Sequence, residues 1–480
     1  MKKLFPFLSI LFLIGCKKSF TELNTDPNNP VTADVKLVLT AAEDNILSEL
    51  SRKEESYDYM SGCFIRAFAG SYDFYDQWDQ ISNRDSDWDK FYNGLLDAKD
   101  VITRGSAQGL WQHVAVAKII TANTLGYLTD IYGDIPYSEA LQGPAVPAPH
   151  FDAQERIYDS IFSLLNQGIT DLDKIAVATL GAEDFIYNGS IQKWKGLAYL
   201  LLARYHNHLS IKEPLASATE TLDNIDKALA AGFVSSNGDF VYPYKNSGKD
   251  NPWSGFYSNS PWILASYDFM NLMETTNDPR KENYWTKAII DGAYRGKENS
   301  SATSGNLTQT YSRLGGFFDK KDSPMEIATY AELRFIEAEA AFRKGDFTRA
   351  ADAYNKAIIA SIDHVTPWYT GTISGSDLTQ YVQKITDYKQ NNAQENASGI
   401  TLAKIMTQKY IAMFPMNTES WVDVRRHNYQ YPGYQKIPTN DAGTPVATDF
   451  TWRGLYPQNE LSKNPNTPIT TLYQKLWWNQ

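Results

Sequence analysis

The chain has 480 residues and a net charge of -11, with 45 Lys and Arg against 56 Asp and Glu. This acidic balance, without any dense basic stretch, excludes nucleic acid as an expected partner because phosphate groups would be repelled. The hydrophobic share of 42% can supply a large core, and the 12 Trp and 30 Tyr favour surfaces that bind neutral, hydroxylated molecules or other proteins.

The first residues have the features of a cleavable leader. Two lysines precede an apolar run from Phe5 to Leu13, which is too short to cross a bilayer as a helix. The following Leu13-Ile14-Gly15-Cys16 resembles the bacterial lipobox, in which the cysteine is lipidated and becomes the new N-terminus. We therefore expect a signal peptide over residues 1–15, lipidation at Cys16 and a polar tether over residues 16–30. A secretory leader that merely contains a cysteine is the alternative.

From residue 31 onward, apolar residues recur at helical spacing. The pattern predicts helix pairs over about 108–175, 190–231 and 324–361. In the third pair, small and aromatic residues occupy the positions typical of a tetratricopeptide hairpin, namely Ala338, Gly345, Phe347, Ala350, Tyr354 and Ala357. We expect a mostly α fold, with one domain over residues 31–480 built on tetratricopeptide-like helix pairs that carry long irregular insertions.

Two helix starts are predicted from capping boxes, in which a side chain at each end satisfies a free backbone N–H. Asp152 with Glu155 would begin one helix, and Ser323 with Glu326 would begin another, with proline at its first position.

The first insertion, about residues 69–90, alternates rings with amide and carboxylate groups. Tyr72, Tyr75 and Trp78 are spaced by three, which on a helix would place them on one side. That side is either a core face or a platform for a sugar, whose apolar face stacks on flat rings and whose hydroxyls need polar neighbours. Asn83 and Arg84 are the candidate polar neighbours.

The second insertion, about residues 240–318, carries four rings among turn residues between positions 251 and 262, without helical or strand periodicity. We expect Trp253 and Tyr257 to contact a ligand and Trp262 to pack beneath the loop. Exposed rings also mark protein interfaces, so contact with a partner protein is the competing use of this loop.

Enzymatic and metal sites are not predicted. His206 and His208 would point to different sides of a helix, and no histidine or cysteine spacing fits zinc. Residues 85–89 begin like a calcium loop, but the required Gly and Glu are replaced by Lys90 and Leu96. We therefore expect no catalytic residue, no metal and no cofactor. A glycoside hydrolase stays open as an alternative because it needs only two suitably spaced carboxylates.

Six segments, in this order behind the lipobox, carry a family resemblance. They are Leu23 to Pro30, Tyr132 to Ala140 with Tyr-Gly-Asp-Ile-Pro-Tyr, Asn277 to Arg280, Tyr330 to Ala340, Trp421 to Arg426 and Arg453 to Leu461. Together they resemble the SusD/RagB family of outer-membrane nutrient-binding lipoproteins, in its SusD-like branch with the Tyr-Gly-Asp-x-Pro-Tyr motif.

The resemblance implies a non-catalytic lipoprotein, anchored to the outer membrane and exposed on the cell surface. It would bind oligosaccharides or other nutrients and deliver them to a TonB-dependent SusC-like transporter. A structural lid of that transporter without its own ligand site is an alternative. Surface exposure rests on the resemblance alone, because residues 17–19 lack the acidic cluster of some surface lipoproteins.

We expect most of the shared segments to be structural, and ligand contacts to lie in the insertions. The expected structural roles are a turn fixed by Asp134 and Pro136, a helix start braced by Asp278 and Arg280, and pairing of Arg425 and Arg426 with acidic groups beneath the tail.

Overall fold

The computed structural model describes residues 33–51, 57–70, 85–245, 248–254, 263–299, 306–318, 320–414, 416–434 and 449–480. The predicted signal peptide, Cys16 and the tether lie outside these residues. None of the described helices is long and apolar enough to cross a membrane.

The described part of the chain is mostly helical, which confirms the predicted fold class. The helices of the N-terminal half are α2 (Val35–Leu50), α3 (Tyr57–Phe64), α4 (Asp85–Gln108), α5 (Trp111–Tyr132), α6 (Gln154–Leu172), α7 (Ile191–His208) and α8 (Pro214–Ala230). Those that follow are α10 (Tyr267–Thr275), α11 (Lys281–Tyr284), α12 (Leu307–Thr310), α13 (Tyr330–Arg343), α14 (Phe347–Thr370), α15 (Gly375–Asn392), α16 (Leu402–Ala412), α17 (Asn417–Arg426) and α18 (Gln458–Lys463).

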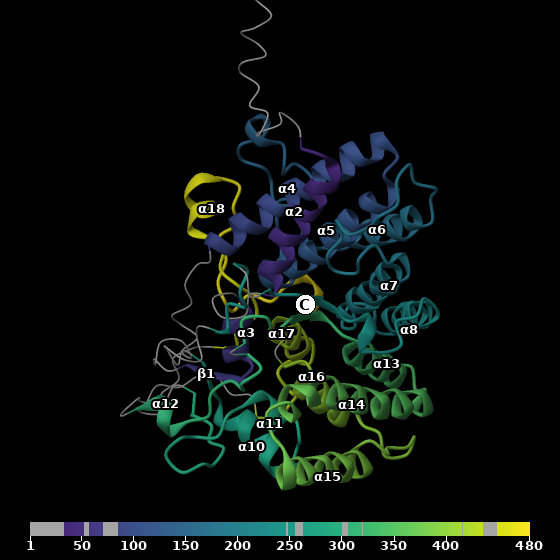
Figure 1. The fold of residues 1–480 in the computed structure, drawn as a ribbon. Coiled ribbons are helices and arrows are strands. Elements are labelled where there is room, and N and C mark those ends of the chain that lie inside the picture. Colours follow the sequence, from purple (N-terminus) through teal and green to yellow (C-terminus); the bar gives the residue numbers. More distant parts are fainter. Residues whose placement is uncertain are drawn as a thin grey trace, which may run out of the picture.

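Neighbouring helices pack as pairs, α5 on α6, α7 on α8 and α13 on α14, and successive pairs also touch. Figure 1 shows them stacked in chain order, from α4 and α5 at the top through α7 and α8 to α13, α14 and α15 at the bottom. Small residues allow this close approach. A Cβ at Gly126 of α5 would overlap the ring of Tyr205 of α7, whose hydroxyl donates to the carbonyl of Asn123 at 3.2 Å.

The strands are short and form two antiparallel pairs. Strand β1 (Phe68–Gly70) pairs with β3 (Ile263–Ala265), and β2 (Phe240–Tyr242) pairs with β4 (Met325–Ala328). Each pair joins segments that are far apart in the sequence. The β1–β3 pair joins the beginning of the first predicted insertion to the middle of the second, and β2 lies at the beginning of the second.

Both predicted capping boxes are wrong. Residues 325–328 form strand β4, paired with β2, so helix α13 begins only at Tyr330. Its capping box consists of Thr329 and Glu332. Helix α6 has Ala153 at its N-cap and no side-chain cap, because the carboxylate of Asp152 instead accepts the backbone N–H groups of Tyr137 at 2.9 Å and Ser138 at 2.7 Å.

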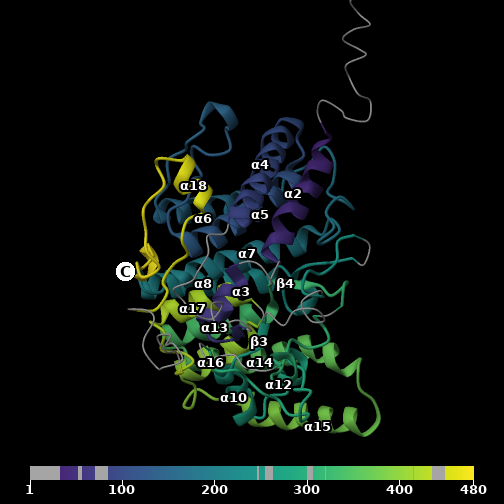
Figure 2. The ribbon, with the colours of Figure 1, turned by 90° about the vertical axis from the view of Figure 1, so that its left-hand side faces the viewer.

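The C-terminal segment returns along the helix stack. Figure 2 shows it, in yellow, running beside α6 and α8 toward the C-terminus. Trp452, Tyr456, Leu476 and Trp478 are buried in the main core. The Trp478 indole donates to the carboxylate of Asp130 in α5 at 3.0 Å. This hydrogen bond ties the C-terminal tail to α5.

Candidate functional site

The two predicted ligand-binding insertions are attached to the same end of one strand pair. Gly70, the last residue of β1, is the register partner of Ile263, the first residue of β3. The first insertion continues from residue 71, and the ring-rich part of the second insertion, positions 251–262, ends directly before β3. Because the strands are antiparallel, the chain leaves β1 and enters β3 at the same end of the ladder. Two regions almost two hundred residues apart in sequence thus meet there.

The strand pair is held by contacts at the opposite end of its ladder, near Phe68 and Ala265. The guanidinium of Arg66 pairs with the carboxylate of Asp268, and the hydroxyl of Ser266 donates to the carbonyl of Arg66. The side-chain amide of Asn299 donates to the carbonyl of Phe68 at 2.8 Å, and the N–H of Lys297 donates to the carbonyl of Ala265 at 2.8 Å. The attachment point of both insertions is therefore a fixed part of the fold.

Most of the predicted ligand contacts lie outside the described residues. These are Tyr72, Tyr75, Trp78, Asn83, Arg84 and Tyr257, together with Trp262, which was expected to pack beneath its loop. Their expected roles stay predictions.

Trp253 is described, and the structure corrects its expected role. Its side chain is 0% exposed. The ring packs against Phe68 of β1, with 6.0 Å between ring centroids, and against Phe318 at 5.6 Å. The backbone N–H of Trp253 donates to the side-chain carbonyl of Asn251 at 3.0 Å, in a turn that directs the ring inward. Trp253 therefore anchors the second insertion to β1 and presents no free ring face to a ligand.

The Tyr-Gly-Asp-Ile-Pro-Tyr segment forms the turn that ends α5 and begins the connection to α6. Gly133 has a φ of 83°, a conformation that favours glycine. The carboxylate of Asp134 accepts the N–H of Gln154 at 2.8 Å, and the hydroxyl of Tyr92 donates to the carbonyl of Pro136 at 2.7 Å. The hydroxyl of Tyr456 donates to the carbonyl of Asp134 at 2.7 Å. This segment has the expected structural role of a turn, and it also fixes the C-terminal tail.

The Asn-Asp-Pro-Arg segment forms a buried ion pair at the start of α11. Asp278 and Arg280 are both 0% exposed, and the carboxylate of Asp278 lies 2.6 Å from the guanidinium of Arg280. The guanidinium also donates to Gln408 at 2.7 Å and to Ser361 at 3.1 Å. Burial raises the pKa of the Asp278 carboxyl, but the charge of Arg280 outweighs burial and the net pKa is lowered. The predicted bracing role is confirmed, and the pair ties α11 to α14 and α16.

The two arginines of α17, Arg425 and Arg426, have different kinds of partner. Arg426 is paired with Glu339 at 2.7 Å and with Asp423, as expected. Arg425 has no acidic partner among the described residues, which corrects the prediction for it. Its guanidinium lies 3.6 Å from the centre of the Trp421 ring and donates to the carbonyl of Trp452 at 2.8 Å. Cation–π stacking and carbonyl acceptors take the place of an ion pair here.

A buried ionic cluster lies beneath these elements. The ring of His208 in α7 is placed between the carboxylates of Asp130, at 3.1 Å, and Glu419, at 3.2 Å. Burial lowers the pKa of His208, but the two carboxylates outweigh burial and raise it to about 9. The raised pKa favours a protonated imidazole, which can donate to both carboxylates. The three side chains therefore form a buried ion-pair network.

Sequence reasoning missed this cluster because its three members come from α5, α7 and α17. Only the fold brings them together, and no local spacing signals their proximity.

Comparison with known proteins identifies the family. Residues 27–457 match the model of a SusD-like family described as "Starch-binding associating with outer membrane". Because the match extends over most of the sequence, the chain belongs to this family, and the predicted resemblance is confirmed. A comparison with curated proteins gave no match.

Solved structures share the fold over nearly the full chain. A SusD/RagB family protein from Bacteroides thetaiotaomicron has 22% identity and a TM-score of 0.76, covering 93% of this chain and 99% of that chain. A chitin-binding SusD homolog from Flavobacterium johnsoniae has 22% identity and a TM-score of 0.74, covering 92% and 98%. A SusD homolog from Bacteroides fragilis has 21% identity and a TM-score of 0.77, covering 93% and 100%. At these identities the likeness establishes the shared fold.

Proposed function

We propose that this chain is a non-catalytic receptor that binds oligosaccharides, or related nutrients, at the outer membrane and delivers them to a TonB-dependent SusC-like transporter. The family description and the chitin-binding relative with the same fold support a glycan ligand. The observation that carries the proposal is the pairing of Gly70 with Ile263, which attaches both ring-rich insertions at one end of the β1–β3 ladder.

In this proposal the rings of the two insertions form one binding surface. Tyr72, Tyr75 and Trp78 from the first insertion and Tyr257 from the second stack on sugar faces, since flat rings complement the axial hydrogens of a pyranose. Asn83 and Arg84 hydrogen-bond to sugar hydroxyls. Trp253 is assigned a supporting role, because its buried ring holds the second insertion against β1.

The proposed location follows from the leader and the family. Acyl chains on Cys16 would hold the mature protein at the outer membrane, and two or more chains are needed for a stable anchor. The polar tether over residues 16–30 would let the domain reach the transporter from the cell surface.

The test combines calorimetry with a reducing-end assay on the purified mature chain. The probes are linear starch oligosaccharides and chitin oligosaccharides of four to six units, chosen from the family description and the chitin-binding relative. Heat of binding without new reducing ends is the expected result. New reducing ends would identify a hydrolase, and neither heat nor product from either series would favour the lid without a ligand site.

A further inference from the structure

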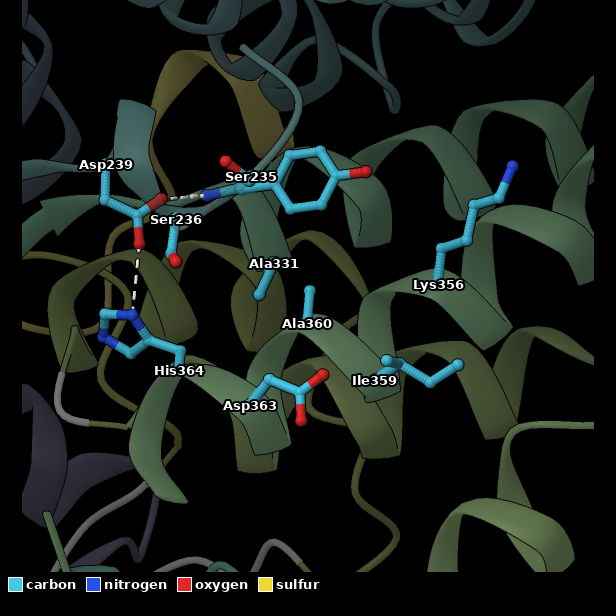
Figure 3. Close-up of a pocket in the computed structure, with 10 residues that line it drawn as sticks. Ser235, Ser236, Asp239, Ala331, Lys356, Ile359, Ala360, Asp363 and His364 are labelled. Atoms are coloured by element: carbon cyan, nitrogen blue, oxygen red, sulfur yellow. Dashed lines mark hydrogen bonds and ion pairs between the residues drawn. The ribbon is translucent and has the colours of Figure 1, made fainter. Parts of the chain in front are cut away.

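A separate pocket opens where three helical segments meet, and no residue of the β1–β3 ladder lines it. It lies between the turn η3 (Ser236–Gly238), the first residues of α13 and the middle of α14, and its volume is about 280 Å³. This is near the lower end of the roughly 300–1,000 Å³ range of small-molecule sites. Figure 3 shows Asp239 and His364 together at one end and Lys356 at the other, with Ala331 and Ala360 between them.

The charged groups of the pocket are already paired within the protein. The ring of His364 lies 3.2 Å from the carboxylate of Asp239 and 3.1 Å from that of Glu326. The ammonium of Lys356 lies 2.7 Å from the carboxylate of Asp352, one turn earlier on α14. Asp363 is paired with Lys389 of α15. Because each charged side chain that lines the pocket has an opposite partner, none is left unpaired for an ionic ligand.

Three hydroxyl groups also line the pocket. Among the described residues, no hydrogen-bond partner is found for the side-chain hydroxyls of Ser235, Ser236 and Tyr330, although all three line the pocket. Ser235 and Ser236 are exposed and Tyr330 is half-buried. The apolar side chains of Ala331, Ile359 and Ala360 also line the pocket, and Figure 3 shows Ile359 and Ala360 across the pocket from Ser235 and Ser236. Hydroxyls facing an apolar wall suit a ligand that has its own hydroxyl rim and apolar face.

The walls of the pocket are held in place. The carboxylate of Asp239, 7% exposed, accepts the backbone N–H of Tyr330 at 2.7 Å as well as pairing with His364. This one side chain therefore links the end of η3 to the start of α13 and to α14. A site that is already formed loses little conformational freedom on binding.

From these observations we propose that the pocket binds one ring of a neutral sugar, either free or at the end of a glycan. The hydroxyls of Ser235, Ser236 and Tyr330 take the sugar hydroxyls, and the apolar wall takes the ring face. The site shares no residue with the insertions. This inference rests on the proposed function, in which the insertions hold the nutrient and the pocket is a second point of attachment.

Saturation-transfer NMR tests this site in a mature chain that carries Trp78→Ala and Tyr257→Ala, which remove proposed sugar contacts of the insertions. Glucose and N-acetylglucosamine are the neutral probes, and glucuronate and glucosamine are the charged ones. We expect transfer to the neutral probes to fall at least fivefold in the double variant Ser235→Ala/Ser236→Ala. It should fall as far in Ala360→Phe, which fills the pocket. Transfer should be unchanged when Ser376→Ala, at an exposed serine of α15, is added to the same chain.

Three results would overturn the proposal: no transfer to either neutral sugar, transfer that persists in both pocket variants, or stronger transfer to the charged probes. Transfer that is seen with the wild type but is absent from the Trp78→Ala/Tyr257→Ala chain would assign the sugar to the insertions instead. Equal unfolding midpoints across the variants would show that a loss reflects the pocket and not the fold.

Discussion

At the scale of single residues, Trp253 shows how a ring in an irregular loop can belong to the core. Its surroundings in the sequence, Pro252, Ser254 and Gly255, are typical of an exposed turn. Its position is decided by Phe68 and Phe318, which are distant in the sequence and provide its packing surface. Composition predicts which loops are rich in rings, but it cannot say which ring finds a partner in the core.

We predict that Trp253→Ala destabilises the fold before it affects ligand contacts. Loss of a buried Trp side chain costs about 3–5 kcal/mol in the free energy of unfolding, whereas Trp253→Phe, which keeps an aromatic ring, should cost less. Urea denaturation of both variants measures the difference. Normal stability combined with weakened oligosaccharide binding in Trp253→Ala would show that the ring faces a ligand after all.

The ionic cluster around His208 predicts a specific pH dependence. The pKa of His208 is raised to about 9 in the folded protein, above about 6.5 in an unfolded chain. Its stabilising contribution is therefore complete below pH of roughly 6.5 and is lost as the pH rises through about 9. At roughly 1.4 kcal/mol per pKa unit, the contribution of His208 is at most about 3 to 4 kcal/mol.

Denaturation of the wild type and of His208→Gln between pH 6 and pH 10 tests this dependence. The variant should be less stable at pH 6 and should lose less stability on the alkaline side. His150→Gln, at an exposed histidine, should follow the wild type. An alkaline loss of equal size in His208→Gln and the wild type would be inconsistent with a protonated His208 between Asp130 and Glu419.

At the scale of elements, the start of α13 shows why helix boundaries are hard to predict. The pattern of Ser or Thr followed three residues later by Glu occurs twice, at Ser323 and at Thr329. Pairing of β4 with β2, more than eighty residues earlier in the chain, makes residues 325–328 extended. Only the second pattern is then free to cap a helix. The periodicity of α13 and α14 was sufficient to predict the helices, but not where the first begins.

We predict that Thr329→Ala lowers the free energy of unfolding by about 1 kcal/mol, as is typical for the loss of an N-cap hydroxyl. The hydroxyl of Thr329 accepts the N–H of Glu332 at 3.1 Å. Thr386→Ala, at an exposed position within α15, should change stability by less than about 0.5 kcal/mol. Equal effects of the two substitutions in chemical denaturation would mean that Thr329 contributes nothing as a cap.

At the scale of the whole molecule, the sequence was enough to predict the fold class and the family, because six ordered segments and the helical periodicity extend over most of the chain. It could not predict the contacts between distant segments. The pairing of Gly70 with Ile263, and the placement of His208 between Asp130 and Glu419, depend on the folded arrangement. The candidate site was therefore predicted as two separate loops, and the fold adds that their attachment points are adjacent.

The proposed anchor makes a prediction for the whole protein in its host cell. Replacement of Cys16 by serine removes the thiol that would carry the acyl chains, so we expect the protein to leave the membrane fraction and appear in the soluble fraction. Metabolic labelling with a fatty-acid analogue should mark the wild type and not Cys16→Ser. Retention of the variant in the outer-membrane fraction would contradict lipid anchoring through this residue.

The most direct test of the proposed function asks whether the two insertions share one ligand. Calorimetric titration of an oligosaccharide that binds the wild type, into Trp78→Ala, Tyr257→Ala and the double variant, gives a double-mutant cycle. We expect each single variant to lose about 1–3 kcal/mol of binding free energy, by analogy with aromatic stacking on bases, and the cycle to show coupling of about 0.5–3 kcal/mol. Tyr267→Ala, at an exposed tyrosine beyond the opposite end of β3, should bind normally. Affinity unchanged in all the variants would contradict a binding site formed jointly by the two insertions.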